Sequence, residues 1–115
     1  MSLQKGDVVL VPFPFTDLTG TKLRPGLVLW VDSAGNDITV CFISSQNTNN
    51  LSPEEFVLEQ SDTEFSGTGL KVISKVRVTR LVTLERRLIT RRIGKLGANH
   101  IQHLNLLMLQ AFQLT

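Results

Sequence analysis

The stretch PGLVLWVDSAGNDITVCFISS (25–45) decides the fold, because it contains two apolar runs separated by a turn. The first run (25–33) is apolar and typical of a buried strand, and the second (37–45) is rich in β-branched residues. The residues AGND (34–37) between them favour a tight turn, so the two runs are expected to pair as a hairpin. Trp30 lies in the middle of the first strand and is expected in the core.

Further strands are predicted on both sides of this hairpin, and polar loops separate them. Valine-rich or alternating segments predict these strands: DVVLVPF (7–13), EFVLE (55–59), KVISKVRVTRLVTL (71–84) and LITRRIGKL (88–96). The polar segments predict loops at 16–22, 46–55 and 60–69. Five to six short strands with no helix between them predict a mainly β fold, a small and strongly bent antiparallel barrel.

The last segment, ANHIQHLNLLMLQAFQLT (98–115), differs from the rest because it predicts an amphipathic helix. Apolar residues recur at steps of three or four, at Ile101, Leu104, Met108 and Phe112, with Leu107, Ala111 and Leu114 beside them. The helix is expected to be capped near Asn99 and to pack across the sheet or against a partner. His100 and His103 have a spacing that suits a metal, but no third ligand is in view, so both are expected to be exposed and no metal site is predicted.

Length and composition indicate a single domain spanning 1–115. No apolar run approaches the roughly 18 residues of a membrane span, and no secretory signal follows Met1. The single cysteine, Cys41, cannot form an internal disulfide, and it is expected to be a buried residue of a protein in the reducing cytoplasm.

Charge is distributed unevenly, although the net charge is only +2. Residues 1–70 hold three basic and nine acidic side chains, whereas residues 71–95 hold nine basic and one acidic. This asymmetry indicates either a polyanionic partner or neutralisation of one half by the other. The alternative interpretation is that the basic residues are solvated side chains of exposed strands.

The sequence contains no phosphate-binding loop, dinucleotide fingerprint, zinc-binding cysteine set or Ser-His-Asp arrangement. The remaining candidates are polar residues at strand ends. Pro25 holds Arg24 extended just before a buried strand, and the hairpin places Arg24 beside Ser44. Arg77 and Thr79 share one face of another strand. Together they form a cationic, hydroxyl-bearing cluster without a carboxylate, suited to binding a phosphodiester.

A purely structural interpretation of these residues is also open. Arg24 would then form a salt bridge with a loop acid such as Asp17, and Ser44 and Ser45 would simply end the strand.

At this point the chain resembles the MazF/PemK family of toxin endoribonucleases, and more closely its PemK-like branch. The resemblance is carried, in the family's order, by KGDVVLVPFPFTD (5–17), KLRPGLVL (22–29), CFISSQ (41–46), TGLKVISKVRV (68–78) and LVTLERRLITRRIGKL (81–96). With the terminal helix, these segments cover nearly the whole chain.

The resemblance implies an SH3-like barrel, a homodimer, and metal-independent cleavage of single-stranded RNA, such as mRNA, without a cofactor. The ribose 2′-hydroxyl would attack the adjacent phosphate, giving a 2′,3′-cyclic phosphate and a free 5′-hydroxyl. It also implies a cognate antitoxin whose acidic, disordered tail fills the RNA groove, contact with DNA only through that antitoxin, and no membrane partner.

By the same resemblance, Arg24, Ser44, Arg77 and Thr79 are the catalytic positions. The residues expected to contact RNA are Asp17, Thr19, Thr21, Lys22, Ser45, Gln46, Lys75 and Arg80. Lys71, Arg86, Arg91 and Arg92 belong to the basic segment, and only some of its residues are expected to line or flank the groove, because alternating side chains cannot all face one way. Some family members carry an aspartate where this chain has Thr79, and a histidine in the first loop that is missing here. These departures leave the general base undefined, with Asp17 as the candidate.

Two other functions are compatible with the same fold. The first is an RNA- or protein-binding module that has lost cleavage through the missing aspartate and histidine. The second is a gyrase poison like the CcdB toxins, which look similar in fold but lack the Arg-Pro step seen at Arg24.

Overall fold

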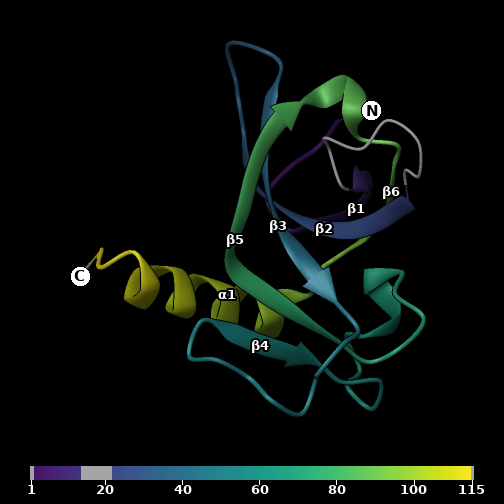
Figure 1. Cartoon of the computed structure of the whole chain (residues 1–115), viewed down its shortest axis with the longest axis vertical. Helices are drawn as coiled ribbons and strands as arrows, with labels where there is room; N and C mark the ends of the chain where they lie inside the picture. Colours follow the sequence, from purple (N-terminus) through teal and green to yellow (C-terminus); the bar gives the residue numbers. More distant parts are fainter. Residues whose placement is uncertain (1, 14–21, 115) are drawn as a thin grey trace.

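A computed structural model describes residues 2–13 and 22–114. In these ranges, six strands form one antiparallel sheet that is followed by one α-helix (Figure 1). The elements are β1 (Asp7–Phe13), β2 (Lys22–Val31), β3 (Asp37–Ser44), β4 (Glu55–Leu58), the 3-10 helix η1 (Ser66–Thr68), β5 (Ser74–Glu85), the 3-10 helix η2 (Arg86–Leu88), β6 (Arg91–Lys95) and α1 (Ala98–Ala111).

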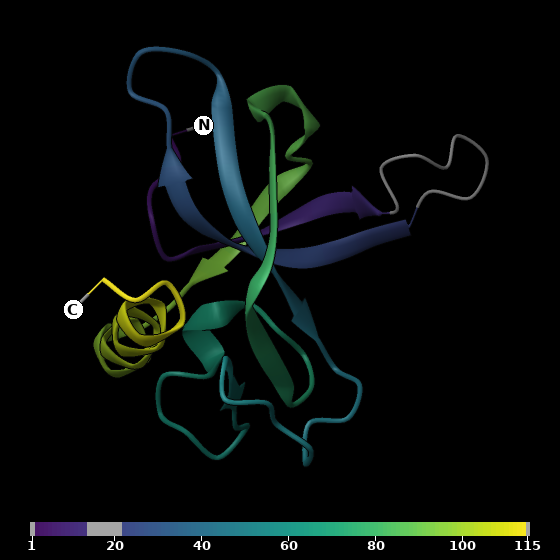
Figure 2. The same cartoon turned by 60° about the vertical axis from the view of Figure 1, so that its left-hand side comes forward.

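The strand order is β4-β5-β3-β2-β1-β6, and the sheet curls into a half-barrel (Figure 2). This confirms the predicted mainly β fold with a C-terminal helix. The barrel stays open because its two edge strands, β4 and β6, are not paired with each other.

The predicted hairpin is confirmed as β2 and β3. Gly26 pairs with Phe42 and Val31 with Ile38, and the amide of Asp32 donates to the carbonyl of Asp37 at the turn. Continuing this register towards the open end of the hairpin brings Arg24 opposite Ser44. The Arg-Pro step and the end of β3 therefore meet at one corner of the sheet.

Both faces of the sheet are buried, because consecutive strand residues contribute to two different cores. The helix-side core gathers Val8, Leu27, Cys41, Phe56, Val76, Val78, Leu104 and Leu107, among others. The second core gathers Leu3, Val9, Val11, Val28, Ile38, Val40, Leu84 and Ile89. Cys41 is buried as predicted, and burial raises the pKa of its thiol to about 12.

The helix α1 packs beside β4 and β5 through Leu104 and Leu107 (Figure 1). It is shorter than the predicted 98–115, because it ends at Ala111 and Leu114 beyond it is exposed. The described helices include none long and apolar enough to cross a bilayer.

The prediction that Trp30 lies in the core is wrong, since half of its surface is exposed. The register of β2 against β3 shifts between Val28 and Trp30, so the strand bulges at Leu29. A bulge interrupts the alternation of side chains, and here Leu29 stays buried while Trp30 faces solvent.

Candidate functional site

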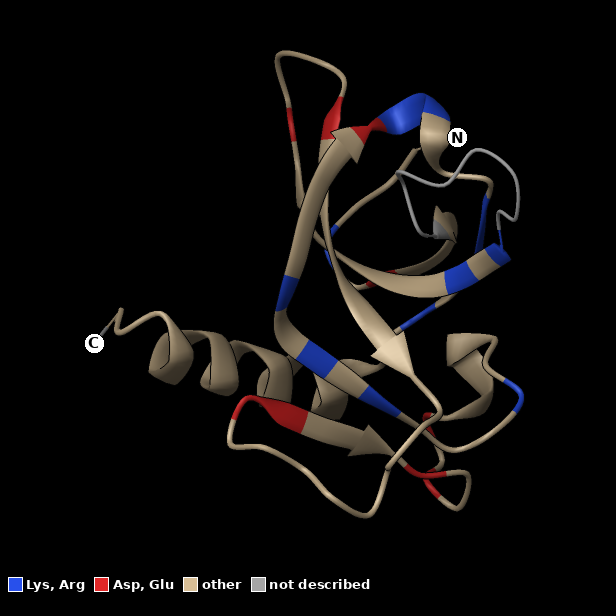
Figure 3. Cartoon of the chain, in the orientation of Figure 1, with Lys and Arg blue, Asp and Glu red and all other residues tan. Residues whose placement is uncertain are grey.

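A groove of about 700 Å³ opens where the starts of β2 and β5 meet the end of β3. It is lined by Arg24, Pro25, Phe42, Ile43, Ser44, Ser45, Gln46, Leu70, Val72, Ser74, Arg77, Thr79, Arg80 and Leu81. All four predicted catalytic positions therefore border one space, although they come from three strands. Figure 3 shows basic residues along β5 and at the start of β2.

The first wall of the groove is the open end of the hairpin. Arg24 is exposed there and precedes Pro25, whose ring fixes the backbone beside it. The hydroxyl oxygen of Ser44 accepts a hydrogen bond from the amide of Gln46, at 3.1 Å. This bond uses the oxygen as an acceptor, so the hydroxyl proton can still be donated to an anion in the groove.

The second wall is formed by a bulge in β5. Cys41 of β3 pairs with Leu81, but the next residue, Phe42, pairs with Arg77. Residues 78–80 of β5 therefore have no partner on β3. Thr79 and Arg80 are both exposed and both line the groove, which a regular strand would prevent because successive side chains alternate.

A carboxylate lies next to this wall, which corrects the prediction of a cluster without one. Glu55 on β4 pairs in register with Arg77, and its Oε2 accepts a hydrogen bond from Arg77 Nε at 2.9 Å. Its Oε1 accepts one from Lys75 Nζ at 3.0 Å. Burial by itself raises the pKa of Glu55, but the donors Ser52 N–H, Lys75 and Arg77 outweigh it and lower the pKa below its ordinary value.

Lys75, one of the residues expected to contact RNA, does not line the groove. It is buried, and its ammonium group is bound to Glu55 and to the carbonyl of Asn50. Its charge is neutralised there by the carboxylate of Glu55. The sequence gives no sign of this ion pair, because Glu55 and Lys75 are 20 residues apart.

The remaining predicted contacts divide into three groups. Ser45, Gln46 and Arg80 line the groove as expected. Lys22 begins β2 and is exposed but does not line it. Asp17, Thr19 and Thr21 lie outside the residues that the structure describes.

The other basic residues of the second half, Lys71, Arg86, Arg91 and Arg92, do not line the groove. Arg92 instead lies 3.7 Å from the buried carboxylate of Asp7 on β1. For Arg92, neutralisation of one half of the chain by the other is therefore part of the explanation for the charge asymmetry.

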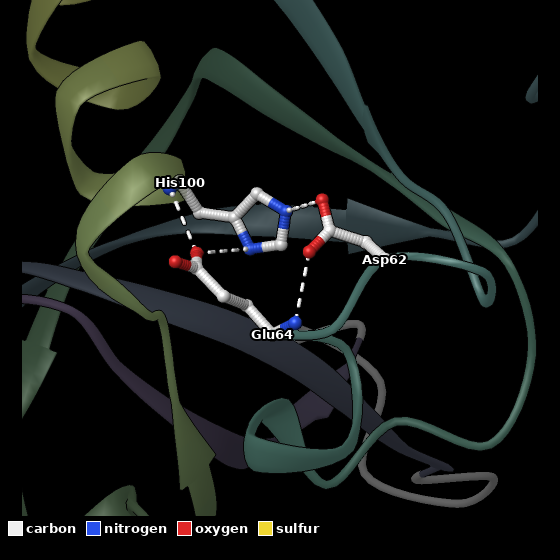
Figure 4. Close-up of side chains that lie close together, drawn as sticks. All are labelled: Asp62, Glu64 and His100. Carbon is white, nitrogen blue, oxygen red and sulfur yellow. Dashed lines mark hydrogen bonds and ion pairs between the residues drawn. The ribbon is translucent and has the colours of Figure 1, made fainter.

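A second polar cluster lies away from the groove, at the start of α1 (Figure 4). The ring of His100 stands between two carboxylates, with Nε2 3.3 Å from Asp62 and Nδ1 3.5 Å from Glu64. The expectation of an exposed His100 is wrong, because only 6% of its surface is exposed. His103 is exposed, and its ring lies 4.6 Å from that of Phe56.

Glu64 also corrects the prediction of a cap near Asn99. The N-cap residue is Gly97, which has no side chain to cap with. The carboxylate of Glu64 instead accepts hydrogen bonds from the amides of Asn99 and His100, at 3.1 and 3.2 Å. The helix start is thus capped from the loop that precedes η1.

This cluster brings together three possible metal-ligating residues, Asp62, Glu64 and His100. However, the two carboxylates face different nitrogens of the imidazole ring (Figure 4). The lone pairs of those nitrogens diverge, so an ion bound to one nitrogen would be directed away from the carboxylate at the other. We therefore interpret the cluster as a structural link between this loop and α1.

The curled sheet with one terminal helix is also the fold of several solved structures. One is an endoribonuclease in complex with its cognate antitoxin from Mycobacterial species, with TM-score 0.74, 14% identity, and coverage of 99% of this chain and 98% of that one. Another endoribonuclease from Mycobacterial species gives TM-score 0.69, 15% identity, and coverage of 98% and 93%. The Mycobacterium tuberculosis toxin MazF-mt6 gives TM-score 0.71, 20% identity, and coverage of 93% and 96%.

At these identities the structures establish the fold alone, a MazF-like half-barrel with one terminal helix. The family follows from the sequence, since residues 4–112 match the model of the PemK-like, MazF-like toxin of type II toxin-antitoxin systems. The chain belongs to this family, as the resemblance predicted. No curated protein sequence matches it.

Proposed function

We propose that this chain is a toxin endoribonuclease that cleaves single-stranded RNA, including mRNA, through the ribose 2′-hydroxyl. The observation that carries the proposal is the groove, which brings Arg24, Ser44 and Arg77 from three strands to one space. Membership in the toxin family supports it, as do the similar structures described as endoribonucleases.

The groove suits the charge that develops in this reaction. As the 2′-oxygen bonds to phosphorus, the phosphate passes through a phosphorane with additional negative charge, which fixed cations stabilise. The ion pair with Glu55 engages only Nε of Arg77 among the described residues, so its terminal nitrogens are left to donate to phosphate. Arg24 would supply a second guanidinium, and Ser44 a hydroxyl donor.

The products follow from the bonds exchanged. The O2′–P bond forms and the P–O5′ bond breaks, which leaves a 2′,3′-cyclic phosphate and a free 5′-hydroxyl. The 2′-hydroxyl loses a proton and the leaving 5′-oxygen gains one. Thr79 cannot accept a proton near neutral pH, and we propose Asp17 as the acceptor. The nucleophile belongs to the substrate, so this route needs neither a metal-activated water nor a cofactor.

The same groove would receive the inhibitor. We propose a cognate antitoxin whose acidic, disordered tail competes with RNA for the cationic groove, because both are anionic chains. One similar structure is described as a complex with its cognate antitoxin. The working form would be a cytoplasmic homodimer that meets DNA only through the antitoxin.

The test is incubation of the purified protein with labelled mixed-sequence single-stranded RNA in EDTA. We expect fragments ending in a 2′,3′-cyclic phosphate, and no cleavage of RNA whose 2′-hydroxyls are methylated. Arg24→Ala and Arg77→Ala should each lower kcat by about 10²–10³-fold. Arg87→Ala is the matched control, because Arg87 is exposed, pairs with Glu85 and does not line the groove.

The competing function is an RNA-binding module that does not cut. It is favoured by Thr79, which stands where some relatives have a catalytic aspartate. If RNA binds to the folded protein but stays intact, the protein is this binding module and not a nuclease. If Arg24→Ala and Arg77→Ala both still cleave RNA at the wild-type rate, the groove is not the catalytic site.

A further inference from the structure

Glu55 lies beside the groove, bonded to Arg77 of its wall, and no part of the proposed reaction uses it. Only 8% of its side chain is exposed. Its two oxygens accept hydrogen bonds from three groups: the amide of Ser52 at 2.9 Å, Lys75 Nζ at 3.0 Å and Arg77 Nε at 2.9 Å. A carboxylate held in this way is charged and has a fixed orientation.

These contacts argue against Glu55 as the missing proton acceptor. A general base needs a lone pair directed at the proton that it removes and a pKa near the working pH. Both oxygens of Glu55 are already occupied by donors, and those donors lower its pKa. A proton placed on Glu55 would break the pairs with Lys75 and Arg77.

The same contacts make Glu55 a junction between the groove and the loop 46–54. On one side it holds Arg77 by Nε, and on the other it holds the amide of Ser52. Lys75 strengthens the junction by also donating to the carbonyl of Asn50 at 3.3 Å. A second hollow of about 550 Å³ lies between this loop and β5, and it shares Arg77, Thr79 and Arg80 with the main groove.

We propose that Glu55 is a positioning residue: it is held in place by Lys75 and by the amide of Ser52, and it fixes the guanidinium of Arg77 for the scissile phosphate. The proposal rests on the proposed ribonuclease function and adds the group that orients one of its cations. Arginine has several rotatable bonds, and an anchor at Nε restricts the plane of the guanidinium while leaving its outer nitrogens to the substrate.

The variant that tests this is Glu55→Gln, which keeps the shape of the side chain but removes its charge. A catalytic group misplaced by about 1 Å can cost about 10²-fold in rate, so we expect kcat to fall by about 10–100-fold. KM should stay the same or decrease, because the variant removes a negative charge beside an anionic substrate. The pH profile should keep its shape, because no base is lost. Glu59→Gln is the control, an exposed glutamate outside both hollows with the same change of charge.

A double-mutant cycle separates positioning from other roles. If Glu55 acts through Arg77, then Glu55→Gln should have no further effect on kcat once Arg77→Ala is present. Additive effects would overturn the proposal. So would an increase of kcat/KM in Glu55→Gln, which would make Glu55 an anion that competes with the substrate. If Glu55→Gln loses the acidic limb of the pH profile, Glu55 is the general base and not a positioning residue.

The outcomes also separate this inference from the proposed function. If the wild-type protein does not cut RNA, both the proposed function and the role of Glu55 are refuted. If the wild-type protein cuts RNA and Glu55→Gln has an unchanged kcat, only the role of Glu55 is refuted. If thermal unfolding shows that Glu55→Gln does not fold, the cycle is run with Glu55→Asp. This variant keeps the charge but shortens the reach, so a partial loss that disappears with Arg77→Ala supports positioning, and an additive loss refutes it.

Discussion

Removing the carboxylate of Glu64 should destabilise the protein by about 2 kcal/mol. The two capping hydrogen bonds, to the amides of Asn99 and His100, together contribute about 1–2 kcal/mol. A negative charge at a helix N-terminus adds about 0.3–1 kcal/mol. The side chain is 19% exposed, so solvent screens these contacts only in part. Glu64→Ala should lose both contributions, and Glu64→Gln should lose less because it keeps one oxygen.

The assay is urea unfolding followed by circular dichroism, with thermal unfolding alongside. For a chain of this length, about 2 kcal/mol corresponds to a decrease in Tm of about 8 °C. All samples need the same protein concentration, because the stability of the proposed homodimer would depend on it. Glu59→Ala is the control and should change the free energy of unfolding by less than about 0.5 kcal/mol. If Glu64→Ala is no less stable than this control, Glu64 does not cap α1.

Three further outcomes are expected away from the groove. Burial raises the pKa of the Cys41 thiol from 9.0 to about 12, so the thiol stays protonated in the folded state. The contribution of Cys41 to the free energy of unfolding is therefore full below pH 9.0, and it is lost as pH rises towards about 12. Urea unfolding at about pH 8 and about pH 10 should show this decline, and Cys41→Ala should show less of it. Gly94→Ala should cost about 3 kcal/mol in the same assay, because a Cβ there would lie 2.3 Å from the backbone carbon of Thr68. Leu104→Ala should cost about 2–5 kcal/mol, since Leu104 is fully buried, whereas Leu106→Ala, half exposed on the same helix, should cost less than about 0.5 kcal/mol; equal losses would contradict the placement of α1.

Local patterns were sufficient to predict the hairpin and the part of the site that depends on it. The apolar runs and the turn at 34–37 fix which strands pair, and the register then brings Arg24 to Ser44. The alternating pattern of 71–84 likewise predicted a strand, and β5 forms there, with Val76 and Val78 buried. These features depend on residues that are close together in the sequence, so local hydrophobic patterns and turn residues are enough to predict them.

The features that the sequence did not reveal depend on contacts between distant segments. Trp30 was predicted in the core because periodicity does not show a bulge at Leu29. Glu55 was not singled out, because only the pairing of β4 with β5 brings it beside Arg77. His100 was predicted to be exposed because Glu64, which contacts it in the folded structure, lies 36 residues earlier in the sequence.

The pairing of β1 with β6 has a consequence for how this protein matures on the ribosome. Synthesis runs from the N-terminus, so Asp7–Phe13 is the first strand to emerge and Arg91–Lys95 the last. One edge of β1 therefore stays unpaired until β6, the last strand of the sheet, has been translated. A nascent chain cannot complete its sheet before that moment, and translation that stops before β6 leaves an exposed strand edge, the kind of surface that quality control and aggregation both recognise.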